Sequence, residues 1–170
     1  MKEELVVLVD KNDEVLGYEE KMAAHEKGLL HRAFSIFVFD LQGRLLLQKR
    51  AQRKYHSGGL WTNTCCSHPR PDEDIEAAAH RRLKEELGFD CPLTWAYSFI
   101  YRSELDKGLT EHEYDHVFFG TYEGQITPNP EEVGLCNYIS LHEIERDIHL
   151  HPQRYTEWFK ITFDQMKAHR

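Results

Sequence analysis

Residues 61–69, which read W-T-N-T-C-C-S-H-P, place two chemically reactive side chains close together in the sequence. Cys66 is a potential acid, because a thiol can lose and recover a proton, and His68 is a potential metal ligand. A cysteine pair in an apolar loop is usually a pair of small buried hydrophobic residues. The neighbouring His68 is what favours a functional site here.

Other residues with metal-binding chemistry lie elsewhere in the chain. If residues 110–116 (T-E-H-E-Y-D-H) are extended, Glu111, Glu113 and Asp115 share one face of the strand. Carboxylates that share a face repel one another, so this face requires either a cation or water among them. The spacing of His25 and His31 is not a metal signature by itself, and each alone is more typical of a partly exposed residue.

Residues 81–89 (R-R-L-K-E-E-L-G-F) match most of the tail of the Nudix box, G-x5-E-x7-R-E-U-x-E-E-x-G-U, where U is aliphatic or aromatic. In this register Ser67 replaces the first glycine and Arg82 replaces the glutamate of the R-E pair. Losing that glutamate weakens a hydrolytic metal cluster. Arg82 lies one helical turn from Glu86, and its guanidinium suits a diphosphate because it can bind phosphate oxygens bidentately. The alternative is a solvated helix with an Arg82–Glu86 ion pair.

The elements that must position these residues follow from apolar patterning, turn residues and glycines. We expect the W-T-N-T-C-C-S-H-P segment to be a loop, and a long helix to begin at Pro71 and end at Gly88. The pattern predicts strands over 5–10, after the turn at 11–14, and over 31–40, 44–49, 95–102, 113–122 and 137–140. It predicts helices over 19–27, 71–88, 141–147 and 152–169. This order predicts an α+β fold in which helices sandwich a mixed sheet.

The composition limits the classes of function. A chain of 170 residues fits one domain spanning residues 1–170, and its net charge of -8 disfavours nucleic-acid binding. No apolar run reaches the roughly 20 residues of a membrane span, and the N-terminus has no signal-peptide pattern, so we expect a cytoplasmic protein with reduced cysteines. An acidic chain that binds an anion must concentrate its cations, or a metal, in one pocket.

Taken together, these segments closely resemble type I isopentenyl diphosphate isomerase, a family with the Nudix fold. Four stretches carry the resemblance: A-A-H-E-K-G-L-L-H-R-A-F-S, G-G-L-W-T-N-T-C-C-S-H-P, R-R-L-K-E-E-L-G and E-H-E-Y-D. Their order and separations fit from Lys21 to about Trp158, nearly the whole chain. The resemblance implies interconversion of isopentenyl diphosphate and dimethylallyl diphosphate in isoprenoid biosynthesis, by moving a double bond through a carbocation-like state.

The resemblance also implies roles for individual residues at the reacting end of the substrate. Cys66 and Glu113 are the implied acid and base, Tyr101 assists the carboxylate, and Trp158 faces the cation. The implied ligands of one transition metal are His25, His31, His68, Glu111 and Glu113. Imidazole and carboxylate ligands suit Zn²⁺, Mn²⁺ or Fe²⁺ better than Mg²⁺.

At the diphosphate end, the resemblance implies a Mg²⁺ ion held by Glu86 and the backbone carbonyl of Cys66. The implied diphosphate-binding cations are Lys21, Arg50, Lys54 and Arg82. The expected partner is therefore a small-molecule diphosphate, with no nucleic acid and no membrane, and the protein is a monomer or a homodimer. Two alternatives are a Nudix hydrolase of a nucleotide or other diphosphate and a non-catalytic metal-binding module.

Overall fold

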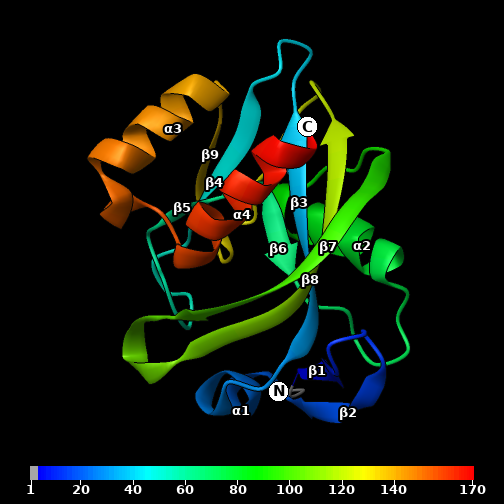
Figure 1. Ribbon diagram of the computed structural model, residues 1–170. Helices are drawn as coiled ribbons and strands as arrows, with labels where there is room; N and C mark the ends of the chain where they lie inside the picture. Colours follow the sequence, from blue (N-terminus) through cyan, green and yellow to red (C-terminus); the bar gives the residue numbers. More distant parts are fainter. Residues whose placement is uncertain (1–3) are drawn as a thin grey trace.

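A mixed β-sheet is the framework of the computed structural model, which describes residues 4–170 (Figure 1). Its strands are β1 (Leu5–Val9), β2 (Val15–Glu20), β3 (His31–Phe39), β4 (Leu45–Arg50), β5 (Trp61–Thr62), β6 (Cys65–Ser67), β7 (Leu93–Glu104), β8 (Thr110–Thr121) and β9 (Val133–Ile139). The helices are α1 (Lys21–Lys27), α2 (Ile75–Leu87), α3 (Leu141–Leu150) and α4 (Glu157–His169). Short 3₁₀ turns occupy Asp106–Gly108 and Pro152–Arg154.

Strand β3 brings the chemistry-bearing segments together. It pairs in parallel with β8, with His31 opposite Glu113, and antiparallel with β6, with Ser35 opposite Cys66. Its residues are almost all buried, as expected for an apolar strand covered on both faces. Strands β6 and β8, which are far apart in the sequence, therefore both lie beside β3.

Helices cover both faces of the sheet, which confirms the predicted sandwich. Helix α2 packs on one face, where Ala79, Leu83 and Leu87 join a core that includes Phe34 and Phe118. Helices α3 and α4 lie on the other face, in front of the sheet in Figure 1, and their cluster contains Phe37, Ile144 and Phe159. The α+β expectation is therefore correct.

The structure corrects the prediction that residues 61–69 form a loop. Two short strands, β5 and β6, occupy part of this segment and pair with β4 and β3. Buried side-chain amide and hydroxyl groups attach the segment to the sheet: Asn63 Nδ2 donates to the carbonyls of Ile36 (3.2 Å) and Cys65 (3.0 Å), and Thr64 Oγ1 donates to Leu46 O at 2.6 Å. The T-N-T triplet is therefore polar because these side chains satisfy the backbone of an irregular strand.

Several predicted helix boundaries were also wrong. Helix α2 begins at Ile75 because Asp74 caps it, accepting from Ala77 N at 3.1 Å, whereas Asp72 adopts a positive φ of 63° that a helix does not allow. The final helix begins at Glu157 because Thr156 caps it after the 3₁₀ turn at Pro152–Arg154. Helix α1 begins at Lys21, since Glu20 still belongs to β2. Among residues 4–170, no helix combines the length and apolar character needed to cross a membrane.

Three strands are longer than predicted. Strand β7 spans Leu93–Glu104, β8 spans Thr110–Thr121 and β9 spans Val133–Ile139. Strands β7 and β8 form one long antiparallel hairpin, closed by the 3₁₀ turn at Asp106–Gly108, which extends beyond the rest of the sheet in Figure 1. Polar residues hid these extensions from the hydrophobic pattern, and the polar part of β8 is where the site lies.

Gly88 ends α2 in the left-handed conformation (φ 70°), and a Cβ there would lie 2.5 Å from the Thr127 carbonyl oxygen. We predict that Gly88→Ala lowers the free energy of unfolding by more than about 2 kcal/mol, because it adds a steric clash to the backbone strain. Gly108→Ala is the control, since Gly108 has a similar φ (72°) and none of the described atoms lies within 4 Å of its would-be Cβ. Urea unfolding measures both, and equal losses would contradict the clash with Thr127.

Candidate active site

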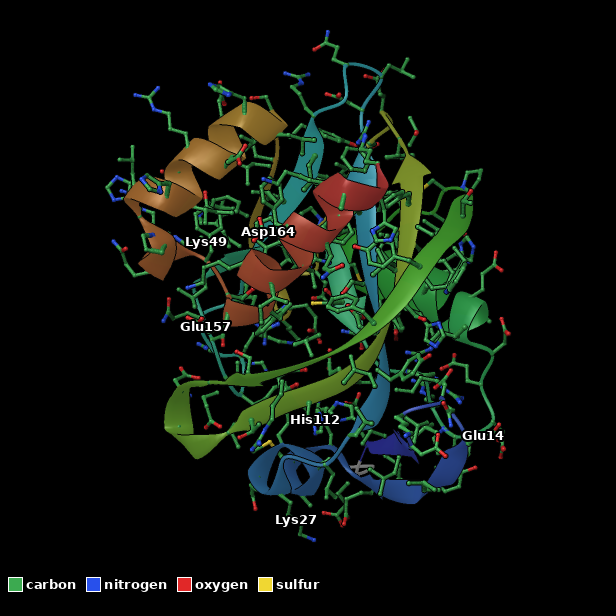
Figure 2. The ribbon with its side chains drawn as sticks, viewed as in Figure 1. Glu14, Lys27, Lys49, His112, Glu157 and Asp164 are labelled. Atoms are coloured by element: carbon green, nitrogen blue, oxygen red, sulfur yellow. The ribbon has the colours of Figure 1, made fainter. Side chains whose placement is uncertain are left out.

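Strand β8 carries two carboxylates into a buried cluster. Glu111 and Glu113 are each 5% exposed, whereas His112 between them points to the other face and its Nδ1 contacts Gly28 O at 3.0 Å. Figure 2 labels His112 at this position, on β8 next to α1. The alternation expected for an extended segment is confirmed, but a solvated face is excluded. Asp115 shares the buried face and accepts from Ser35 Oγ at 2.7 Å.

Three histidines converge on the Glu111 and Glu113 carboxylates from different elements. His25 comes from α1, His31 begins β3, and His68 follows β6; the first two are fully buried, which is contrary to the exposed alternative. His68 Nε2 lies 3.0 Å and His31 Nε2 3.3 Å from Glu113 Oε2, and His25 Nε2 lies 3.4 Å from Glu111 Oε2. One potential ligand atom from each of the five residues lies within 4.8 Å of the others.

The orientation of the rings fits a metal ion. His25 Nδ1 lies 2.7 Å from Lys21 O and His31 Nδ1 lies 2.9 Å from Leu29 O, so each Nδ1–H donates to a backbone carbonyl. Each Nε2 is then a free lone pair that faces the carboxylates, and neither atom has a hydrogen-bond partner within residues 4–170. A transition metal bound by both nitrogens accounts for these orphaned atoms, and backbone acceptors are the usual support for such ligands.

Burial also keeps most of the imidazoles in the neutral form that binds metals. Burial, reinforced by His68, lowers the pKa of His31 to about 3, and burial lowers the pKa of His68 as well. Burial opposes protonation of His25, but Glu111 outweighs it and raises the pKa of His25. Burial, together with Glu111 and Asp115, raises the pKa of Glu113 well above its usual range. A cation at this cluster would reverse the shift at Glu113.

A small cavity of about 30 Å³ adjoins the cluster and is lined by Cys66, Glu113, Tyr101 and Trp158. Tyr101 Oη donates to Glu113 Oε1 at 2.5 Å, and Trp158 Nε1 donates to Cys66 Sγ at 3.2 Å. Burial raises the pKa of Cys66 to about 12, so its thiol is protonated at neutral pH. The cavity therefore holds a protonated thiol and the carboxyl group of Glu113, two groups that can each give or take a proton.

The two adjacent cysteines lie on opposite faces of β6, as successive strand residues must. Cys66 lines the cavity, whereas Cys65 is fully buried in the core that packs on α2. Both are free thiols in the part of the chain that the structure describes. Cys65 is therefore a packing residue.

The four predicted diphosphate-binding cations also gather in one place. A second cavity of about 60 Å³ shares Arg50, Cys66 and His68 with the first, and is lined by Glu86 and by the cations Lys21, Arg50, Lys54 and Arg82. Because the two cavities share lining residues, the polar end and the reacting end of a short substrate fit one continuous site. This is the cationic pocket that a chain of net charge -8 needs for an anionic ligand.

Carboxylates already pair with three of these cations. Lys21 Nζ lies 2.6 Å from Glu4, Lys54 pairs with Glu132, and Arg82 Nη2 lies 2.8 Å from Glu86 and 3.4 Å from Glu132. The predicted Arg82–Glu86 ion pair is thus present, and Arg82 also faces the cavity. The ion-pair and diphosphate alternatives for Arg82 are compatible.

Sequence reasoning missed three residues of the site. Gln48 donates to Glu86 Oε1 at 2.8 Å, Glu132 bridges Lys54 and Arg82, and His56 lines the reaction cavity. Gln48 lies on a strand whose pattern reads as apolar, and Glu132 and His56 lie in loops. Because their contacts are made across the fold, no local pattern marks them.

Comparison with known proteins identifies first the class and then the family. The NUDIX domain model matches residues 29–159, and a solved structure from Deinococcus radiodurans with 18% identity superposes with a TM-score of 0.76, covering 93% of this chain and 96% of that one. The fold is therefore a Nudix fold. An Aromatoleum aromaticum protein named isopentenyl-diphosphate Delta-isomerase 2 is 52% identical, with 96% of this chain and 87% of the relative covered. A protein of the same name from Photorhabdus laumondii is 55% identical, with 93% of this chain and 89% of the relative covered.

The chain belongs to the isopentenyl-diphosphate Delta-isomerase family. The predicted resemblance and the prediction that the protein is an isomerase of this family are therefore confirmed. The clustered histidines and glutamates form a candidate metal site in a member of that family.

The five-residue cluster predicts that a divalent transition metal stabilises the fold. At a free Mn²⁺ concentration 100 times its Kd, the free energy of unfolding should rise by about 2.7 kcal/mol, because the metal binds the native state. His25→Ala should lose most of this increment. His80→Ala should keep it, since His80 contacts Asp90 away from the cluster. Urea unfolding with Mn²⁺ or with chelator measures the increment, and equal Mn²⁺ stabilisation of His25→Ala would contradict the assignment.

Proposed function

We propose that the protein interconverts isopentenyl diphosphate and dimethylallyl diphosphate, with Cys66 and Glu113 as the proton carriers. The single observation that supports this most strongly is that these two groups line one small cavity with Tyr101 and Trp158. In the reaction, the electrons of the terminal double bond form a new C–H bond, and a neighbouring C–H bond breaks to form the new double bond. A tertiary carbocation-like state lies between these steps.

Positioning is the largest contribution we assign to the protein. An unactivated alkene is a poor base, so the acid must be held against it in a dry site. Orientation supplies about 7–11 kcal/mol in favourable cases. A cation–π contact supplies only about 0.5–2 kcal/mol, so Trp158 is secondary to the placement of the acid and base. Excluding water is equally important, since water would trap the cation as an alcohol.

The two proton carriers are held in different ways. Cys66 remains a neutral thiol because desolvation raises its pKa, and the Trp158 indole N–H donates to its sulfur at 3.2 Å. The Tyr101 hydroxyl holds Glu113 Oε1. The second oxygen of Glu113 faces His31 and His68. Because the reaction is reversible, the two carriers exchange roles between directions.

His25, His31, His68, Glu111 and Glu113 would hold a transition metal, for which we propose Mn²⁺ or Zn²⁺, with Fe²⁺ as a further candidate. When bound, this ion lowers the proton affinity of Glu113 and fixes its orientation. Glu86 and the Cys66 carbonyl would hold Mg²⁺ at the diphosphate. Glu86 is suited to that role because Gln48 and Arg82 fix both of its oxygens at the cavity.

Diphosphate binding falls to Lys21, Arg50, Lys54 and Arg82. The lining of the cavity has one more cation than carboxylates, since these four face Glu4, Glu86 and Glu132. A diphosphate would therefore exchange with carboxylates already paired to Lys21 and Lys54. A Mg²⁺ ion bound with the substrate would offset the remaining negative charge.

The geometry disfavours the hydrolase alternative. Arg82 stands where the hydrolase box has a glutamate, so the chain lacks one of the metal-binding carboxylates of a Nudix hydrolase. A non-catalytic metal module gives no reason for the cavity beside the cluster. The single-domain organisation, the cytoplasmic location and the monomeric or homodimeric state stay predictions.

The proposed roles predict a defined loss on removing the thiol. Metal-replete protein in D₂O should equilibrate the two diphosphates and place deuterium in the product, and Cys66→Ala should reduce turnover by roughly 10²–10⁴-fold. Cys65→Ala is the matched control, and should keep turnover while losing about 1 kcal/mol of unfolding free energy from the cavity it leaves. Mass spectrometry of the product measures exchange. Near-normal turnover by Cys66→Ala would rule out the thiol as a proton carrier.

A further inference from the structure

His56 is a buried histidine of the reaction cavity to which neither the metal set nor the proton carriers assign a role. It lies in the loop between β4 and β5, is 2% exposed, and lines the cavity with Cys66 and Trp158. Its Nε2 has no hydrogen-bond partner in the described part of the chain. A buried polar atom without a partner is unfavourable, so its place beside the reacting groups requires an explanation.

This nitrogen faces the carboxylate of Glu111, one of the five proposed metal ligands. His56 Nε2 lies 3.5 Å from Glu111 Oε2, and that oxygen also has no hydrogen-bond partner among residues 4–170. A carboxylate oxygen only accepts, so the facing Nε2 carries the hydrogen. On the other side of the ring, Nδ1 lies 3.2 Å from Ser57 Oγ, whose hydroxyl can donate to it. Both nitrogens therefore have complementary neighbours.

His56 does not belong to the metal cluster itself. The five clustered ligand atoms come from His25, His31, His68 and the two glutamates. Metal binding thus accounts for the orphaned Nε2 atoms of His25 and His31 but leaves that of His56 unexplained. A small movement of the Glu111 carboxylate towards His56 would convert the 3.5 Å contact into a hydrogen bond. Contacts that are long in a free site commonly shorten in the working complex.

The same residue contacts both ends of the site. Its ring is perpendicular to that of Trp158, with an interplanar angle of 86° and ring centroids 5.4 Å apart. It also packs against the Tyr55 ring, with centroids 4.2 Å apart. Its backbone carbonyl accepts from Arg50 Nη2 at 3.1 Å. A shift of His56 would therefore displace both the Trp158 indole and the Arg50 guanidinium. It would also change the surroundings of the Glu111 carboxylate.

We propose that His56 is a positioning residue whose Nε2–H donates to Glu111 and fixes that carboxylate for the transition metal, while its ring supports Trp158. This inference deepens the proposed function and rests on its metal site. Partners of this kind, which orient a ligand without touching the metal, typically contribute 10–100-fold in metal affinity or activity. His56 is expected to act within that range.

The test compares His56→Phe, which keeps a planar ring but loses the N–H, with His56→Gln, which keeps an N–H donor. Zn²⁺ affinity is measured by competition with a chromophoric chelator, and stoichiometry by elemental analysis. We expect His56→Phe to weaken Zn²⁺ binding about 10–100-fold with one ion still bound per chain, and His56→Gln to recover most of it. His80→Phe is the matched control and should bind Zn²⁺ as the wild type does.

Unchanged Zn²⁺ affinity in His56→Phe would overturn the inference while leaving the proposed function intact. Failure of the wild type to bind Zn²⁺ would instead overturn the metal site on which both rest. Complete loss of the ion in folded His56→Phe, not recovered by Gln, would make His56 a ligand and contradict its positioning role. If His56→Phe does not fold, His56→Leu provides the same comparison.

Discussion

The constraint on which the rest of the site depends is the burial of ionisable carboxylates on one face of β8. Glu111 and Glu113 are removed from water, and such groups are strongly unfavourable unless protonated, hydrogen-bonded or paired with a cation. The chain supplies imidazoles from three elements, a tyrosine hydroxyl and His56 around them. It also aims the free nitrogens of His25 and His31 inward. These arrangements become mutually consistent when a divalent cation lies at their centre.

The sheet topology is what brings these groups within reach. Parallel pairing of β3 with β8 sets His31 opposite Glu113, and antiparallel pairing with β6 sets Cys66 on the same side of the sheet as the cavity. Helix α2 then places Arg82 and Glu86 at the adjoining cationic cavity. One strand therefore connects the metal cluster to the thiol, and one helix connects both to the diphosphate end. A proton carrier and its electrostatic environment are thus fixed by the same hydrogen-bonded framework.

Much of the site could be predicted from sequence, because its residues occupy local patterns. Alternation along an extended segment put Glu111 and Glu113 on one face, and the C-x-H register separated Cys66 from Cys65. The T-N-T triplet could not be read as strand, because its polar side chains satisfy backbone groups on other strands. His56 and Glu132 escaped detection for the same reason: each makes its decisive contacts with residues far away in sequence.

The most direct test of the central claim is anomalous X-ray scattering from crystals grown with Mn²⁺, measured on both sides of the metal absorption edge. If a cation balances the buried negative charge on β8, the anomalous difference map should show one strong peak at bonding distance from the His25 and His31 Nε2 atoms. This peak should be enclosed by His25, His31, His68, Glu111 and Glu113. A structure in which Mn²⁺ scatters only at other carboxylates, while this cluster keeps its geometry without an ion, would contradict the account.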